Sequence, residues 1–229
     1  MKWAAQVLAG SLFMLGACSS SGTSLTERLA PELFDLVLGD DEVDPAVTQP
    51  LPRAALVQIP FPTISLQTED DGPIGYAVAQ EVNGPYVIYR DSVRRGVTMA
   101  GGLVTGTAGL GRNVKAVKTQ ANDPVAVPTA LSDWPARVTR SYQFSRRGAA
   151  DFDITVTCSY AHIAEERVVI FEVFYILDRI VENCTNGIRT FENTHWVDAD
   201  TGFIWQSRQW LGPRQDQYLI KIIRRYVAP

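Results

Sequence analysis

The sequence alternates between hydrophobic and polar positions along much of its length, and a period of two residues is typical of β-strands that bury one face. Two extended runs, 151–163 and 166–185, follow one another and are separated by a short polar turn, so we expect them to pair as antiparallel strands. Asn83-Gly84 lies between two further apolar runs and predicts a hairpin. Another turn is expected at 198–202, inside the run 191–211, and a last strand is expected at 216–227.

Prolines and glycines modify this pattern in two places. The segment 56–66 is rich in residues that favour strands, but Pro60 and Pro62 interrupt it, which suits an edge strand or a bulge better than a central strand. The segment 96–111 is dense in glycine, and these glycines are expected to serve bulges or close strand packing rather than a phosphate-binding loop.

A helix is expected near the N-terminus. Thr26 can cap its first turn and Gly39 can end it. The apolar residues that recur between them at helical spacing are Leu29, Leu33, Leu36 and Val37. An acidic linker with prolines, 40–53, follows. The chain is therefore expected to be all-β after one short helix.

The segment 170–178 is apolar on both faces of its predicted strand. The residues expected on one face are Phe171, Val173, Tyr175 and Leu177, and those on the other are Ile170, Phe174 and Ile176. A strand with two apolar faces has to be covered on both sides. We therefore predict a closed or nearly closed antiparallel barrel, or a two-sheet sandwich, with the N-terminal helix capping it.

The first residues have the composition of a secretory signal. Lys2 is followed by an apolar stretch up to Leu15, which is shorter than the roughly 20 residues needed to span a bilayer, and small residues come next. Leu15 to Cys18 also resembles the bacterial lipobox, which implies a lipid on the Cys18 sulfur, cleavage just before it and attachment to a membrane. Ser19 implies, by the same resemblance, sorting to the outer membrane, facing the periplasm.

The chain is accordingly expected to have three parts. They are a signal peptide at 1–17, a lipidated tether with the short helix and linker at 18–53, and a single β-rich domain at 54–229. Cleavage removes Lys2 and no acid, so the net charge of −4 becomes −5 in the mature chain. Hydrophobic residues make up 46% and charged residues 20% of the sequence, a composition typical of a globular domain with a sizeable core.

Two cysteines remain after lipidation, Cys158 and Cys184, and the signal places both in an oxidising compartment. A disulfide between them is expected, and it would stabilise the fold by roughly 3 kcal/mol by restricting the unfolded chain. The competing interpretation is a metal site that adds His162 and His195, but the spacing does not match a structural zinc module. We therefore expect no metal and no other cofactor.

Catalytic motifs are absent from the sequence. It contains no GxSxG or HExxH motif, and its aspartate pairs lie at expected strand starts or turns, where local hydrogen bonding favours aspartate. We expect no enzymatic activity. Trp205 and Trp210 are an odd number of residues apart and would face opposite ways in a regular strand, so one of them could contact a glycan. Large aromatic residues in strands more often pack in the core.

Several stretches resemble one known family, the YjbF/GfcB-type group 4 capsule polysaccharide lipoproteins. The resemblance covers roughly 25–227 and rests on the lipobox at Cys18, on GGLVTGTAGLGRNV at 101–114 and above all on NTHWVDADTGFIWQSRQWLGP at 193–213. It implies a non-enzymatic outer-membrane lipoprotein with a β-rich fold, acting with other proteins that produce or export extracellular or capsular polysaccharide. It assigns no catalytic or ligand residue beyond the lipidated cysteine.

Two functions therefore remain open. In the first, the protein is a component of polysaccharide export that has protein partners and no turnover. In the second, it is a periplasmic protein that binds or modifies glycan. The expected partners are a membrane, through the lipid anchor, other polysaccharide-export proteins and, in the second case, polysaccharide itself. No nucleic-acid partner is expected.

Overall fold

A computed structural model describes residues 50–68, 73–110, 114–145, 150–213 and 217–227. The predicted signal peptide, Cys18, the tether and the helix expected between Thr26 and Gly39 all lie outside the described residues. Within the described ranges, no helix has the length and apolar character needed to cross a membrane.

The described chain consists almost entirely of strands. Its elements are α2 (Arg53–Leu56), β1 (Thr63–Gln67), β2 (Gly75–Asn83), β3 (Tyr86–Arg90), β4 (Gly96–Ala100), β5 (Leu103–Ala108), β6 (Val114–Thr119), the short 3₁₀ helix η2 (Leu131–Asp133), β7 (Arg137–Phe144), β8 (Phe152–Ile170), β9 (Val173–Thr185), β10 (Thr190–Val197), β11 (Ile204–Trp210) and β12 (Gln217–Arg224). The prediction of an all-β chain is confirmed.

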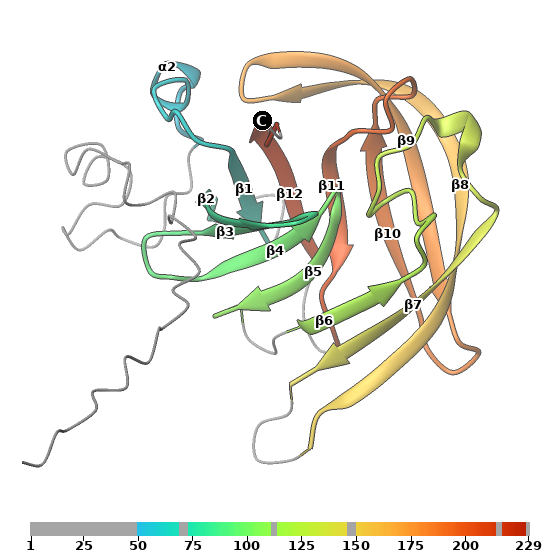
Figure 1. Cartoon of the computed structure of the whole chain (residues 1–229). Helices are drawn as coiled ribbons and strands as arrows, with labels where there is room; N and C mark the ends of the chain where they lie inside the picture. The colour runs from blue at the N-terminus through green and yellow to red at the C-terminus, as the bar shows by residue number, and fades with distance from the viewer. Residues whose placement is uncertain (1–49, 69–72, 111–113, 146–149, 214–216, 228–229) are drawn as a thin grey trace, which may run out of the picture.

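In the part of the chain that the structure describes, twelve strands form one antiparallel sheet with the order β5-β4-β3-β2-β1-β12-β11-β10-β9-β8-β7-β6. Figure 1 shows that the sheet curls into a barrel, so that β5 and β6, at the two ends of this order, come side by side. A hydrogen bond of 2.9 Å from the Val114 N–H of β6 to Thr107 Oγ1 of β5 joins them. Of the two predicted architectures, the structure has the nearly closed barrel rather than the sandwich.

The alternation of residues along the strands places the core inside the barrel. The buried residues of β7 are Val138, Arg140, Tyr142 and Phe144, and those of β10 are Phe191, Asn193, His195 and Val197. Most of them are apolar and belong to one hydrophobic cluster that fills the barrel. The exceptions are Arg140, Asn193 and His195, which put polar groups at inward positions.

β1 lies in the middle of the sheet, between β2 and β12, and all five of its residues are buried. Of the two alternatives predicted for 56–66, the edge strand is therefore wrong. The strand begins after Pro62, so neither proline has to donate a hydrogen bond within the paired segment. The predicted bulge is present, as a register shift between Thr63 and Ile64.

Two of the predicted turns are confirmed. β2 ends at Asn83, and Gly84 has a φ of 57°, the left-handed conformation that glycine adopts at little cost. Between β10 and β11, the Gly202 N–H donates to the carbonyl oxygen of Asp198 over 2.8 Å.

The turn between β8 and β9 lies at a different place from the predicted one. The two strands pair antiparallel as expected, but β8 continues to Ile170 and the chain turns at Phe171 and Glu172, whose φ angles are 45° and 68°. Non-glycine residues rarely adopt such angles, so the sequence carries no turn signal there. Where the turn was expected, the strand has only a register shift between His162 and Ala164.

The ends of β8 and β9 extend beyond their neighbours as a two-stranded arm, residues 163–177. Figure 1 shows the arm reaching across one end of the barrel toward α2. One of its faces packs on the barrel. The ring of Phe171 lies 5.7 Å from that of Tyr76, among apolar residues of α2, β2 and β12, and Tyr175 lies 4.5 Å from Trp205 of β11.

The opposite face of the arm is not covered by any other described element, and the N-terminal helix that was expected to cap the fold lies outside the described residues. Phe174 and Ile176 have exposed fractions of 61% and 56%. This part of β9 pairs with β8 alone, so one of its sides turns toward the barrel and the other packs on no further strand or helix of the described chain.

Candidate functional site

The connection between β6 and β7, residues 120–136, folds into the end of the barrel that carries the arm; we call it the lumen loop. Figure 1 shows it as the yellow-green segment between these two strands. Asp123, Val125 and Ala126 of the loop are buried, and Val125 and Ala126 belong to the hydrophobic cluster of the barrel. The loop is therefore part of the core and closes this end of the lumen.

Two turns of the barrel hold the lumen loop through backbone hydrogen bonds. The Gly102 N–H, in the β4–β5 turn, donates to the carbonyl oxygen of Val125 over 2.8 Å. The Leu131 N–H donates to the carbonyl oxygen of Ala199, in the β10–β11 turn, over 2.9 Å. A buried loop has to satisfy its backbone polar groups, and these two bonds do so for the Val125 carbonyl and the Leu131 N–H.

Both turns place a glycine against the loop. A Cβ atom added at Gly101 would lie 2.6 Å from the carbonyl oxygen of Ala126, and one added at Gly202 would lie 1.9 Å from that of Thr129. Both glycines also have positive φ, 54° and 69°. A residue with a side chain would collide with the loop at either position. Gly101 lies in the glycine-dense segment 96–111, for which close packing was predicted, and Gly202 lies outside it.

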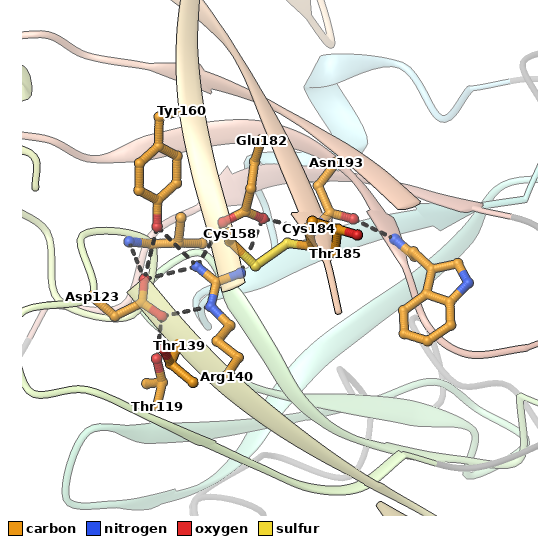
Figure 2. The surroundings of a disulfide bond; sticks show 12 residues. Thr119, Asp123, Thr139, Arg140, Cys158, Tyr160, Glu182, Cys184, Thr185 and Asn193 are labelled. Atoms are coloured by element: carbon orange, nitrogen blue, oxygen red, sulfur yellow. Dashed lines mark hydrogen bonds and ion pairs between the residues drawn. A yellow bond between two sulfur atoms is a disulfide. The ribbon is translucent and has the colours of Figure 1, made fainter. Parts of the chain in front are cut away.

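Arg140 of β7 anchors the loop through buried ion pairs. Its Nε and Nη2 donate to the two oxygens of Asp123 over 2.6 and 2.8 Å, which matches the planar guanidinium to the carboxylate. On its other side, Nη2 lies 2.8 Å from Oε1 of Glu182 and Nη1 donates to Oε2 over 3.0 Å. All three side chains are 0% exposed. Figure 2 shows Arg140 between the two carboxylates.

Both carboxylates have further polar neighbours. Asn193 Nδ2 donates to Glu182 Oε2 over 2.7 Å, and His195 Nε2 lies 3.3 Å from the same oxygen. Asp123 accepts a hydrogen bond from the hydroxyl of Thr119. Two acids thus share one arginine, and the network also includes polar groups of β6, β8 and β10, with the Tyr160 hydroxyl of β8 accepting from Arg140 Nη2 over 3.3 Å.

Glu182 and Arg140 keep their charges at neutral pH. Burial by itself would raise the pKa of Glu182, but Arg140, His195 and Asn193 stabilise the carboxylate and hold that pKa far below its ordinary value. Burial would also lower the pKa of Arg140, and the neighbouring carboxylates, Glu182 first, raise it instead. Burial raises the pKa of Tyr142 to about 12. Glu182, Arg140 and Tyr142 therefore do not exchange protons near pH 7, as general acid–base catalysis requires.

A disulfide joins Cys158 of β8 and Cys184 of β9, which lie directly opposite each other in the strand register and are fully buried. Figure 2 shows the bridge beside Glu182. Among the described residues, Cys158, Glu182 and Cys184 have ligand atoms close enough together for a metal ion. The two sulfurs are bonded to each other and offer no thiolate. His162, which the metal interpretation also needed, is exposed and lies 2.6 Å from Asp178.

The stretch 193–213 supplies several of the inward polar groups. Gln209 of β11 bridges to the β4–β5 turn, because its Nε2 donates to the carbonyl oxygen of Gly102 over 2.7 Å and its Oε1 accepts from the Val104 N–H over 3.1 Å. Asn193 accepts from the Trp210 N–H over 2.8 Å. The two stretches on which the family resemblance rests therefore meet inside the barrel.

The two tryptophans considered for glycan contact are half-buried and pack on different aromatic partners. Trp210 stacks on Phe191 with ring centroids 4.0 Å apart, and Trp205 packs on Tyr175 of the arm at 4.5 Å. A surface pocket of about 360 Å³ at the other end of the barrel includes Tyr218, and neither of these tryptophans lines it. The contact of Trp205 or Trp210 with glycan stays a prediction.

The sequence-based predictions do not include Asp123, Arg140 or Glu182, although two of them carry a signal. Arg140 alternates in register with Val138 and Tyr142, and a charged residue at an inward position of a strand indicates a buried pair. Glu182 has the same signal in β9. Asp123 carries no such signal, because its loop lacks the alternation that would indicate which residues point inward.

The fold and its interior define a class of protein: a barrel-like antiparallel domain whose lumen is filled by its own loop and by a closed ion network. The chain belongs to the family described as group 4 capsule polysaccharide lipoprotein gfcB, YjbF, whose model matches residues 33–223, so the resemblance found in the sequence is confirmed. The fold is similar to the crystal structure of the hypothetical lipoprotein YmcC from Escherichia coli (K12), with a TM-score of 0.66 and 18% identity over 78% of this chain and 91% of that chain. No curated protein matches the chain significantly.

Proposed function

We propose that the protein is a lipid-anchored, non-catalytic component of extracellular or capsular polysaccharide production or export, held on the outer membrane and facing the periplasm. The observation that carries the proposal is the family match over 33–223, because the family's description joins a lipoprotein to a capsule polysaccharide. In this role the protein acts through contacts with other polysaccharide-export proteins.

The closed interior supports a non-catalytic role. The most strongly perturbed charged groups of the described chain, Arg140 and Glu182, are 0% exposed and paired with each other. Perturbed groups mark a reaction site when they line a cleft that substrate can enter. Here they stabilise the lumen loop instead, which favours a structural use of the network.

Cys18 supplies the membrane anchor in this proposal. The lipobox that ends at Cys18 implies several acyl chains, and several chains give stable attachment where a single chain binds only marginally. Ser19, rather than an aspartate, follows the cysteine and favours the outer membrane.

A deletion strain tests the proposal. Extracellular polysaccharide is measured, in amount and chain length, in the deletion strain and in the same strain complemented with wild type or with Cys18→Ala. We expect polymer to fall on deletion and to be restored by wild type only. Immunoblotting of the membrane and periplasmic fractions is the control that Cys18→Ala accumulates. Unchanged amount and length of polymer on deletion would overturn the proposal.

The glycan-binding alternative is tested with purified protein and fragments of the strain's own polymer. The proposal expects no saturable binding and no change in fragment length on size-exclusion chromatography. Binding that Trp205→Ala or Trp210→Ala removes, while circular dichroism shows an intact fold, would replace the proposed role by direct glycan recognition. Shortened fragments would show that the protein is an enzyme.

A further inference from the structure

The exposed face of the arm carries an apolar patch on two paired strands. Arg167 of β8 is opposite Ile176 of β9, and Val169 is opposite Phe174. The exposed fractions of Val169, Phe174 and Ile176 are 57%, 61% and 56%. The guanidinium of Arg167 lies 4.6 Å from the ring centroid of Phe174. We call these four residues the outer arm face; single exposed apolar residues are ordinary, but a contiguous patch marks a contact surface.

The chain enters the described fold beside the tip of this arm. The Arg53 N–H donates to Oε1 of Glu172, in the β8–β9 turn, over 3.2 Å. The Leu51 N–H donates to the hydroxyl of Tyr76, whose ring packs on Phe171 of the same turn. Residues before Pro50 are therefore joined to the fold at the arm, and not at the far end of the barrel.

A short segment before this point is rich in apolar residues, as a partner that covers the outer arm face would have to be. Residues 33–38 read LFDLVL, in which Asp35 is the single polar residue. Such a segment gains free energy when it leaves water, at roughly 25 cal/mol per Å² of apolar surface. The family match begins at residue 33, so it includes this segment and leaves out the signal and the start of the tether.

The distances allow contact. Eleven residues, 39–49, separate the segment from Pro50, and an extended chain of that length spans up to about 36 Å. Ile176 is four residues from the turn at Glu172 along β9, which at about 3.3 Å per residue is roughly 13 Å. The linker is therefore long enough for the segment to reach any part of the outer arm face.

We propose that residues 33–38 of the same chain pack on the outer arm face and cover it. The apolar side chains of the segment meet Val169, Phe174 and Ile176, and its acid, Asp35, matches Arg167, the cation of that face. The inference is independent of the proposed function, since it concerns how the tether joins the barrel and holds whatever the protein does.

Alkylation of single cysteines tests the proposal on the secreted mature chain, carrying Cys18→Ser behind a signal that is cleaved without lipid attachment. Val169→Cys reports on the outer arm face. Val93→Cys is the matched control, because Val93 lies in the β3–β4 turn with a similar exposed fraction of 61%. We expect N-ethylmaleimide to modify Val169→Cys at least tenfold more slowly than Val93→Cys. Adding Leu33→Asp and Leu36→Asp should bring the two rates within twofold.

The remaining outcomes separate the other possible occupants. Equal rates in the unmodified background, or a slow rate that Leu33→Asp and Leu36→Asp leave unchanged, would overturn the proposal. Val43→Asp with Val47→Asp, outside the segment, is the control for added charge and should leave Val169→Cys slow. If the slow alkylation of Val169→Cys becomes fast on dilution, and sedimentation shows a dimer at high concentration, the outer arm face would be assigned to a second copy of the chain. Protection that needs phosphatidylglycerol vesicles would assign it to the membrane.

Discussion

Arg140 is the residue on which the buried network depends most, because it neutralises two carboxylates at once. Arg140→Leu is expected to lower the free energy of unfolding by about 3 to 5 kcal/mol, the usual cost of leaving buried charges without their partner. Urea denaturation followed by circular dichroism measures the change. Lys115→Leu is the control: the Lys115–Asp151 side chains are 48% and 34% exposed, and breaking such a pair costs less than about 1 kcal/mol. Similar losses in both variants would contradict the assigned role of Arg140.

Glu182 makes the stability depend on pH in a defined direction. Its pKa is far below 4.5 in the folded state and about 4.5 in the unfolded state, so the unfolded chain binds the proton first as the pH falls. The stabilisation from this carboxylate is therefore complete above about pH 4.5 and is lost progressively below it.

Glu182→Gln removes this contribution, so the difference in free energy of unfolding between wild type and variant should be largest near pH 7 and should shrink between pH 4.5 and pH 2. Chemical denaturation at a series of pH values measures the difference. A difference that stays constant over this range would mean that Glu182 does not titrate as the network requires.

Single residues were predicted well where local chemistry decides and poorly where tertiary contacts do. Gly84 was identified correctly, because a hairpin needs its positive φ. Phe171 was not, because the contacts of its ring with Tyr76 and the apolar residues around it hold an aromatic residue at a φ of 45° that its own chemistry disfavours. Arg140 carried a readable signal in its inward position, and its partner Asp123 carried none.

At the scale of elements, the contact between the β10–β11 turn and the lumen loop allows a matched comparison of two glycines. Gly202 has a φ of 69° and would place a Cβ 1.9 Å from Thr129 O, whereas Gly187 has a φ of 83° with nothing within 4 Å. Gly187→Ala should cost about 1 to 2 kcal/mol from backbone conformation alone. Gly202→Ala should cost clearly more, because the loop has to move as well. Thermal unfolding of both variants measures this, and equal melting temperatures would contradict the close approach.

The disulfide ties β8 to β9 at the base of the hairpin that carries the arm, and it closes a sequence separation of 26 residues. Cys158→Ala with Cys184→Ala is expected to lower the free energy of unfolding by about 3 kcal/mol, through the greater freedom of the unfolded chain. Wild type denatured in the presence of reductant should give the same value as the double variant. No loss of stability would mean that the bridge does not form in the mature protein.

Elements were predicted best where the pattern of residues is local. The strand pair 151–163 and 166–185 was predicted from alternation. The position of its turn and the extension of the arm beyond the neighbouring strands were not predicted, because a period of two indicates which residues share a face and not where the sheet ends. The central place of β1 was missed for a related reason. Pro60 and Pro62 indicate an irregular entry to a strand, and the strand order depends on which partners lie beside it.

At the scale of the whole molecule, the first and last described strands pair in the middle of the sheet, with Ile64 opposite Ile222. The two halves of the chain therefore share one sheet and one core, and we expect a single cooperative unfolding transition. The tryptophans of the described chain all lie after residue 130, whereas circular dichroism reports on every strand. Equal midpoints from tryptophan fluorescence and circular dichroism would support one transition, and separate midpoints would contradict it.

This pairing also determines when the sheet can be completed. β12 lies between β1 and β11 in the strand order, so until β12 arrives these two strands each keep an unpaired edge. Open edges template aggregation, and contacts between distant parts of a chain form slowly. In the proposed function, the chain crosses into the periplasm from its N-terminus and delivers the closing strand last. We therefore expect the dependence on chaperones that hold unfolded chains to be greatest just after this export.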